Sequence, residues 1–254
     1  MLVGIDHIVI AVEDLDEAAA ELEARLGIAV RGGGRHPRLG TENRLAWLGD
    51  SYIELVTVFD RELADASWLG QPALEALAKG VGLVTWAVAS DSIAVDVAGL
   101  HAAGSGLADP TPGERLRPDG RVVRWQLSLP SRLGPTEPPF LIEHDTTTAE
   151  WSVDERAERA VEAHPLGGPV QLEVLELPMS NVPAAIQSFG RSVGLRFRPS
   201  LAGGGGRDAN VGAQIVRLRP AGRDAIPVIE LSSPAGDGRD AELFGVRWRI
   251  RPSG

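Results

Sequence analysis

The sequence predicts an α+β protein built from repeated β-α-β-β-β modules. Two observations carry this prediction. Three times along the chain, a segment rich in β-branched residues is followed by a capped helical segment and by further strand-like segments. An Ile-Glu pair also recurs at nearly even spacing, at residues 53–54, 142–143 and 229–230. We therefore expect an internal repeat in which each pair lies on the last strand of its module.

The first module opens with GIDHIVIAVEDL at residues 4–15, whose β-branched residues and acidic end are typical of a buried strand. Asp14 is the expected N-cap of a helix, with Glu17 three residues later, and Gly27 is its expected end. The strands that complete the module are expected near residue 28, at 43–49 and at 51–58.

The second and third modules repeat this order. Asp91 and Asn181 are the expected helix N-caps, and Gly194 is expected to end the third helix. The expected strands of the second module are residues 82–90, 121–129 and 140–145, and those of the third include 170–177, AQIVRLRP and IPVIELSS.

Two helical segments, 72–80 and 151–165, connect the modules, and the Pro and Gly residues that follow the second one indicate a boundary near residue 165. We expect residues 1–165 to form one domain of two modules, at about 1–60 and 80–146. Residues 166–254 would hold the third module and an extra C-terminal strand at 243–252, the start of an incomplete fourth module.

Composition excludes several classes of function. The chain of 254 residues has a formal charge of −10, which disfavours a nucleic-acid partner because phosphate binding depends on Lys and Arg. It has no cysteine, so disulfides, thiolate catalysis and Cys-ligated metals are excluded. The N-terminus lacks the basic region of a signal peptide, and no apolar run reaches membrane-spanning length. We expect a cytoplasmic protein without a membrane partner.

Repeated modules with a His on the first strand and a Glu on the last resemble the vicinal oxygen chelate superfamily, which includes glyoxalase I, extradiol dioxygenases and bleomycin-resistance proteins. Within it, DHIVIAV at 6–12, HPRLGTENRLAWLGDSYIELV at 36–56 and PPFLIEH at 138–144 are similar to the group described as the glyoxalase-like domain. The resemblance covers roughly residues 4–165. It implies cupped mixed sheets, the glyoxalase/bleomycin resistance fold, with metal ligands on the first and last strands of each module.

This resemblance places the metal ligands at His7, Glu54 and Glu143, and the fourth position at Thr85, where glyoxalase I has a histidine. By strand alternation, we expect these side chains to converge in one cup. They would hold a divalent ion of Mg, Mn, Ni, Zn or Fe that polarises a substrate oxygen, while Glu143 or Glu54 moves a proton as the catalytic residue.

Other polar residues are expected to bind substrate in the same cup. Arg124 and Gln126 alternate with apolar residues and form a polar row, His36 lies at the expected entrance, and Asn43 and Thr85 could donate hydrogen bonds. Simpler interpretations also exist. His7 could be a hydrogen-bonded histidine on a half-buried strand, and the glutamates could pair with arginines in an empty cup.

Two functions therefore remain open. The first is a metal-dependent lyase or isomerase that acts on a small oxygenated metabolite. The alternative is a metal-free protein that binds or sequesters a small molecule, as bleomycin-resistance proteins do. In a third view, the third module and the extra strand make a homodimer.

Overall fold

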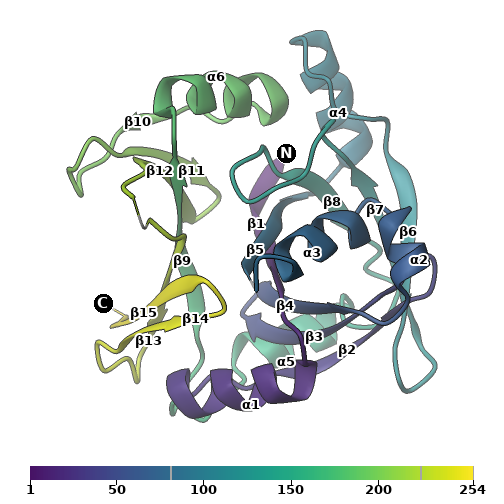
Figure 1. Cartoon of the computed structure of the whole chain (residues 1–254). Helices are drawn as coiled ribbons and strands as arrows, with labels where there is room; N and C mark the ends of the chain where they lie inside the picture. The colour runs from purple at the N-terminus through teal and green to yellow at the C-terminus, as the bar shows by residue number, and fades with distance from the viewer. Residues whose placement is uncertain (81, 224, 254) are drawn as a thin grey trace.

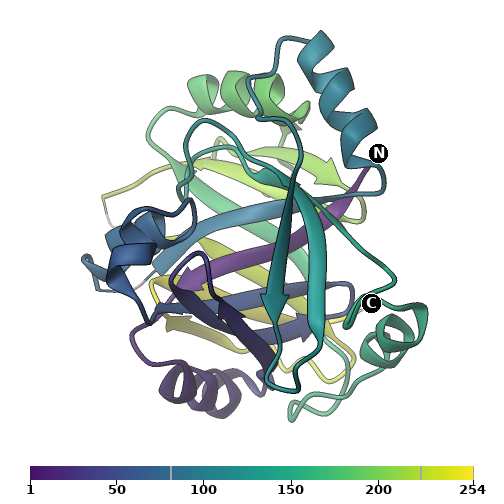
Figure 2. The ribbon, with the colours of Figure 1, turned by 90° about the vertical axis from the view of Figure 1, so that its right-hand side faces the viewer.

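The computed structural model describes residues 1–80, 82–223 and 225–253, and its strands form an eight-stranded closed barrel with a seven-stranded sheet beside it (Figures 1 and 2). The helices are α1 (Leu15–Leu26), α2 (Arg61–Asp65), α3 (Gly70–Leu77), α4 (Ile93–Ala102), α5 (Val153–Ala160) and α6 (Val182–Val193). None of the helices in these ranges combines the length and apolar character that crossing a membrane requires.

The barrel contains the first two modules, and its strand order is β1-β4-β3-β2-β6-β7-β8-β5. Its strands are β1 (Leu2–Ala11), β2 (Arg31–His36), β3 (Thr41–Leu48), β4 (Ser51–Val58), β5 (Gly82–Ser90), β6 (Thr111–Leu116), β7 (Val122–Ser128) and β8 (Phe140–His144). Strand β1 pairs in parallel with β4 and antiparallel with β5, so the first strands of both modules lie side by side. The predicted α+β class with mixed sheets is confirmed.

The helix boundaries of the first and third modules follow the predicted caps. The Asp14 side chain accepts hydrogen bonds from the first turn of α1, and Gly27 ends that helix with a left-handed φ of 69°. Asn181 caps α6 in the same way, and Gly194 ends it with a φ of 70°. The left-handed conformation costs little for glycine, which explains why both helices end at this residue type. Asp91 is not a cap, because the residue before α4 is Ser92.

The second sheet has the order β10-β11-β12-β9-β13-β15-β14 and differs from the expected module boundaries. Its strands are β9 (Gln171–Met179), β10 (Arg198–Pro199), β11 (Arg207–Val211), β12 (Gln214–Pro220), β13 (Val228–Ser233), β14 (Asp240–Leu243) and β15 (Val246–Pro252). Strand β9 pairs in parallel with β12 and antiparallel with β13, as β1 does with β4 and β5. The third module therefore ends at β12, and Glu230 lies on the first strand of a shortened fourth module rather than on the last strand of the third.

One apolar core joins the two sheets. It includes Ile10 of β1 and Trp86 of β5 on the outside of the barrel, and Leu175 of β9 and Trp248 of β15 on the facing side of the second sheet, all fully buried. Phe189 of α6 stacks on Trp86, with ring centroids 6.2 Å apart. Burying each such side chain contributes about 1.5–3 kcal/mol, so this contact fixes the second sheet against the barrel.

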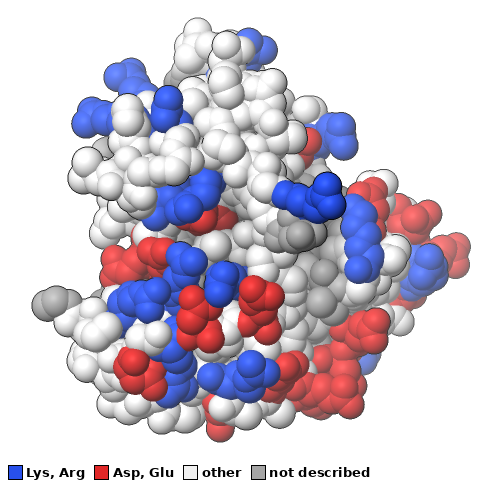
Figure 3. Space-filling view, turned by 60° about the vertical axis from the view of Figure 1, so that its left-hand side comes forward, with Lys and Arg blue, Asp and Glu red and all other residues white. Residues whose placement is uncertain are grey.

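The other face of the second sheet is charged. Figure 3 shows arginines and acidic residues intermixed on this side of the molecule. Ion pairs cross from strand to strand, with side-chain N–O distances of 2.6–3.1 Å for Arg219–Glu176, Arg217–Asp208, Arg249–Glu230 and Arg247–Asp240. Because positive and negative side chains are paired with one another, this face of the sheet has no extended patch of a single charge among the described residues.

Candidate functional site

The inside of the barrel holds a small cavity, of about 40 Å³, that combines aromatic and ionisable side chains. His7, His36, Glu54, Arg115 and His144 all line it and all come from the barrel strands. The aromatic lining is Tyr52, Trp68, Trp125, Phe140 and Trp151. The cavity can hold a few atoms of a ligand in an environment where ionic interactions are stronger than in water.

A shift in the pairing of β1 brings two neighbouring acid–base residues into this interior. Between Ile5 and His7 the register against β5 changes, which interrupts the regular alternation of the strand. Nδ1 of His7 lies 2.6 Å from Oδ1 of Asp6, and Nε2 of His144 lies 3.0 Å from Oδ2 of Asp6. One carboxylate therefore receives two imidazoles, one from each module.

Asp6 remains ionised in this position. Burial alone would raise its pKa, but the charge of His144 and hydrogen bonds from His144 and His7 outweigh burial and hold the pKa well below its ordinary value. Because an ionised carboxylate can only accept hydrogen bonds, Nδ1 of His7 must donate. The other ring nitrogen of His7 is then available to take up a proton.

That nitrogen, Nε2 of His7, faces Glu54. It lies 3.6 Å from Oε2 of Glu54, while Oε1 of Glu54 accepts a hydrogen bond of 2.8 Å from the side-chain amide of Asn43. The His7 ring is stacked on Tyr52, with centroids 4.6 Å apart. Asp6, Asn43 and Tyr52 thus fix the orientation of a His-Glu pair at the cavity.

His36 is a second, neutral imidazole beside the same glutamate. Its Nδ1 lies 3.0 Å from the Thr41 hydroxyl, and its Nε2 lies 4.0 Å from Oε1 of Glu54. Burial lowers the pKa of His36 to about 4, with Arg115 and His7 adding to this effect against the attraction of Glu54. When Thr41 donates to Nδ1, Nε2 carries the proton and can donate to a ligand.

The segment before α5 closes the barrel next to His144. The Trp151 ring is stacked on His144, with centroids 3.5 Å apart and ring planes at 10°. The Arg159 guanidinium lies 3.9 Å from the centre of the Trp47 ring, which holds α5 against the barrel. The connecting segment expected at 151–165 therefore also encloses the cavity, through Trp151 at its start.

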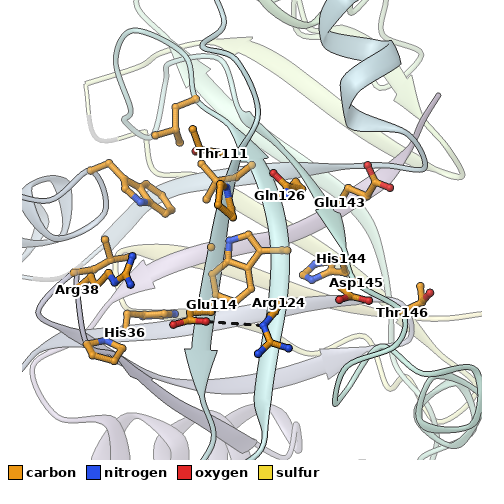
Figure 4. Close-up of a pocket in the computed structure, with 18 residues that line it drawn as sticks. His36, Arg38, Thr111, Glu114, Arg124, Gln126, Glu143, His144, Asp145 and Thr146 are labelled. Carbon is orange, nitrogen blue, oxygen red and sulfur yellow. Dashed lines mark ion pairs between the residues drawn. The ribbon is translucent and has the colours of Figure 1, made fainter.

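The structure separates Glu143, Arg124 and Gln126 from this interior. They lie on the outside of β7 and β8, around an outer pocket of about 1030 Å³ (Figure 4). Oε2 of Glu143 accepts a hydrogen bond of 2.7 Å from the backbone N–H of Ile93, at the start of α4. Figure 4 shows Glu143 and His144 pointing to different sides of β8. The expected convergence of Glu143 with His7 is not observed, because His144 occupies the inner face.

The outer pocket and the inner cavity are neighbours. Five side chains line both of them, and these are His36, Leu39, Trp68, Trp125 and His144. The indole of Trp125 lies across Gly113, where a Cβ atom would come within 2.2 Å of the ring nitrogen. The two pockets are therefore separated by side chains, and a ligand that moved them could occupy both.

The residues present do not fit the metal site that the superfamily implies. Of its four positions, His7 and Glu54 meet in the cavity, Glu143 binds the start of α4, and Thr85 is fully buried without lining the cavity. The Thr85 hydroxyl has no hydrogen-bond partner within the described part of the chain. Across residues 1–80, 82–223 and 225–253, no group of three or more His, Cys, Asp or Glu side chains is arranged to hold a metal ion.

Four residues of this site could not be identified from the pattern. Asp6, Arg115 and Glu150 carry no motif, and strand alternation would place Asp6 opposite to His7. His144 was assigned to the outside because Glu143 was assigned to the inside. The adjacent Asp-His pair at 6–7 was the one available signal, since an acidic neighbour often orients a catalytic histidine.

Comparison with known proteins agrees with this architecture. A family model described as a glyoxalase-like domain matches residues 5–200, which spans the barrel and the start of the second sheet. A hypothetical protein from Staphylococcus aureus has a structure with a TM-score of 0.79 and 16% identity, covering 98% of this chain and 99% of that chain. Methylmalonyl-CoA epimerase from Streptomyces coelicolor has a TM-score of 0.42 and 21% identity, covering 56% of this chain and 98% of that chain. No curated protein matches the sequence.

Proposed function

The chain belongs to the glyoxalase-like domain family, and from that premise we propose that it is an isomerase or lyase that moves a proton of a small oxygenated metabolite inside the barrel. The observation that carries this proposal is the Asp6–His7 pair, in which one imidazole nitrogen is held at 2.6 Å by an ionised carboxylate and the other is directed toward Glu54 at the cavity. An imidazole oriented in this way can act as a general base.

The reaction step needs only residues of this chain. Nε2 of His7 takes a proton from the carbon beside a carbonyl group, and Asp6 stabilises the imidazolium that forms. The electron pair of the broken C–H bond moves onto the carbonyl oxygen. His36 and Asn43, which lie beside Glu54, are the donors that can meet this developing negative charge. Return of the proton to the same or a neighbouring atom completes the isomerisation.

Only two of the four superfamily ligand positions, His7 and Glu54, meet in the cavity. We therefore assign the proton transfer to side chains of the protein. Glu54 is a second group that can accept the proton, since it lies 3.6 Å from Nε2 of His7. Because the two groups adjoin each other, a proton that one of them takes from the substrate can pass to the other.

The direct test is exchange of carbon-bound hydrogen with solvent. Hydroxyacetone and pyruvate, incubated with the protein in deuterated water, would be followed by proton NMR for loss of the signals beside the carbonyl group. We expect exchange that falls roughly 100-fold or more in His7→Gln, because general-base catalysis contributes at least this much. His101→Gln is the matched control, since His101 lies on α4 and bonds the carbonyl of Leu107. Equal exchange in wild type and His7→Gln would contradict the proposal.

The aromatic lining of the cavity favours a second candidate, a protein that binds a small molecule without turnover. Trp68, Trp125 and Trp151 offer flat apolar surfaces, and Glu54 supplies a negative charge beside them. This combination suits a planar or cationic ligand. A thermal-shift screen combined with the exchange experiment separates the two functions. A ligand that raises the unfolding temperature but does not exchange its hydrogen atoms would support binding without turnover.

A further inference from the structure

A buried arginine, Arg115, lies beside the cavity. Arg115 is 4% exposed and lines the cavity. Its Nη2 lies 2.5 Å from Oε2 of Glu150, whereas Nη1 has no hydrogen-bond partner among the residues that the structure describes. Because a buried charged donor without an acceptor is energetically costly, it marks a position where a ligand atom can accept.

Arg115 shares Glu150 with a second arginine, Arg117. Nη1 of Arg117 lies 3.4 Å from Oε1 of Glu150, and Nη2 of Arg117 lies 3.1 Å from Oδ2 of Asp119, so Arg117 has a carboxylate partner of its own. Glu150 has a φ of 70°, a left-handed conformation that is uncommon for a residue other than glycine. This backbone is held in place at the barrel opening, where Arg159 donates to the Glu150 carbonyl. Glu150 therefore engages Arg115 through Nη2, and Nη1, which has no partner among the described residues, remains to donate to a ligand oxygen.

We infer that Arg115 binds the carboxylate of a small 2-oxo or 2-hydroxy acid, which names the substrate class of the site. This inference rests on the proposed function, since it places the carboxylate in the cavity where His7 would take the proton. A guanidinium is suited to this group because its planar N–H donors match the two carboxylate oxygens. A cavity of about 40 Å³ holds only the acid end, and a longer acid extends past Trp125 into the outer pocket.

The test compares a carboxylate with a neutral molecule of similar shape. Pyruvate and hydroxyacetone would be titrated into the full-length protein, with binding measured by amide NMR shifts. We expect pyruvate to bind at least tenfold more tightly, which corresponds to one charge-assisted hydrogen bond. Arg115→Gln should abolish this preference. Arg117→Gln is the matched control, because Arg117 contacts the same Glu150 without lining the cavity, and it should retain pyruvate binding within about threefold.

Equal affinity for the two probes, no binding of either, or unchanged pyruvate binding in Arg115→Gln would overturn the inference. If Arg115→Gln does not fold, Arg115→Lys keeps the charge but loses the planar pair of donors, and it should bind pyruvate several-fold more weakly. Failure of the proposed function can be distinguished from failure of the inferred substrate class. Pyruvate that binds through Arg115 without hydrogen exchange defeats the function alone, whereas exchange of hydroxyacetone without pyruvate binding defeats the substrate class alone.

Discussion

Glu143 on strand β8 accepts a hydrogen bond from the backbone N–H of Ile93, with 2.7 Å between oxygen and nitrogen, and thereby caps α4, the helix of the second module. Ser92, the residue at the N-cap position, makes no such side-chain bond. The negative charge also lies near the positive end of the helix dipole. Glu143, which the family resemblance implies as a catalytic residue, thus has a structural role at the start of α4.

This contact predicts a stability effect without a binding effect. Glu143→Ala should lower the free energy of unfolding by about 1 kcal/mol, the usual cost of losing a helix cap. Urea unfolding measures this change. Glu143→Gln keeps an acceptor oxygen and should lose less. Pyruvate binding weakened more than about threefold by Glu143→Gln would contradict the placement of Glu143 outside the site.

The buried neutral His36 predicts loss of stability in mild acid. Its pKa in the folded protein is about 4, below the ordinary value near 6.5, so the unfolded chain binds a proton first as the pH falls. Stability is therefore lost progressively below about pH 6.5, and the penalty is complete below about pH 4. Between pH 7 and pH 5 this amounts to about 2 kcal/mol.

Urea unfolding of wild type and His36→Asn over this range checks the prediction. The variant has no imidazole at this position, so its stability should fall by about 2 kcal/mol less than that of the wild type. Parallel curves for the two proteins would show that His36 is not held neutral.

The ionised Asp6 predicts the opposite dependence at lower pH. Its folded pKa is lowered, so its contribution is fully present above the unfolded value near 3.9 and is lost as the pH falls toward the folded value. Asp6→Asn should cost about 3 kcal/mol at neutral pH, because two buried imidazoles lose their shared anion.

Unfolding curves at several pH values between 7 and 3 measure this difference. The gap between wild type and Asp6→Asn should stay constant down to about pH 4 and then narrow. Asp65→Asn, an exposed carboxylate on α2, is the control and should change stability by less than about 0.5 kcal/mol. A gap that widens below pH 4 would contradict the assignment.

The ligand geometry predicts that tight metal binding is absent. Protein purified without chelator should contain well under one equivalent of Mg, Mn, Ni, Zn or Fe by elemental analysis. Added Mn²⁺, Ni²⁺, Zn²⁺ or Mg²⁺ should not raise the unfolding temperature, because His7 and Glu54 alone give weak affinity. A stoichiometric metal that is lost in His7→Ala would show that other groups complete the site.

The amino-acid sequence by itself determined the modular architecture, the family, and part of the site. The periodicity of strands and helices depends on residues close together in the sequence, and so do the helix caps at Asp14 and Asn181. These features can therefore be predicted from short segments of sequence. His7, Glu54, Asn43 and His36 were also predicted and do lie together. They lie on the first four barrel strands, where the family resemblance is carried by continuous segments of sequence.

Only the tertiary structure decided which face of each strand is inside. Alternation gives two faces but does not distinguish them, and one change of register on β1 brings Asp6 and His7 to the same region. On β8 the inner face carries His144 instead of Glu143 because β8 pairs with β5 and β7 in one specific register. Such pairings join segments far apart in the chain, so they are fixed by the packing of the whole barrel, and no local pattern contains them.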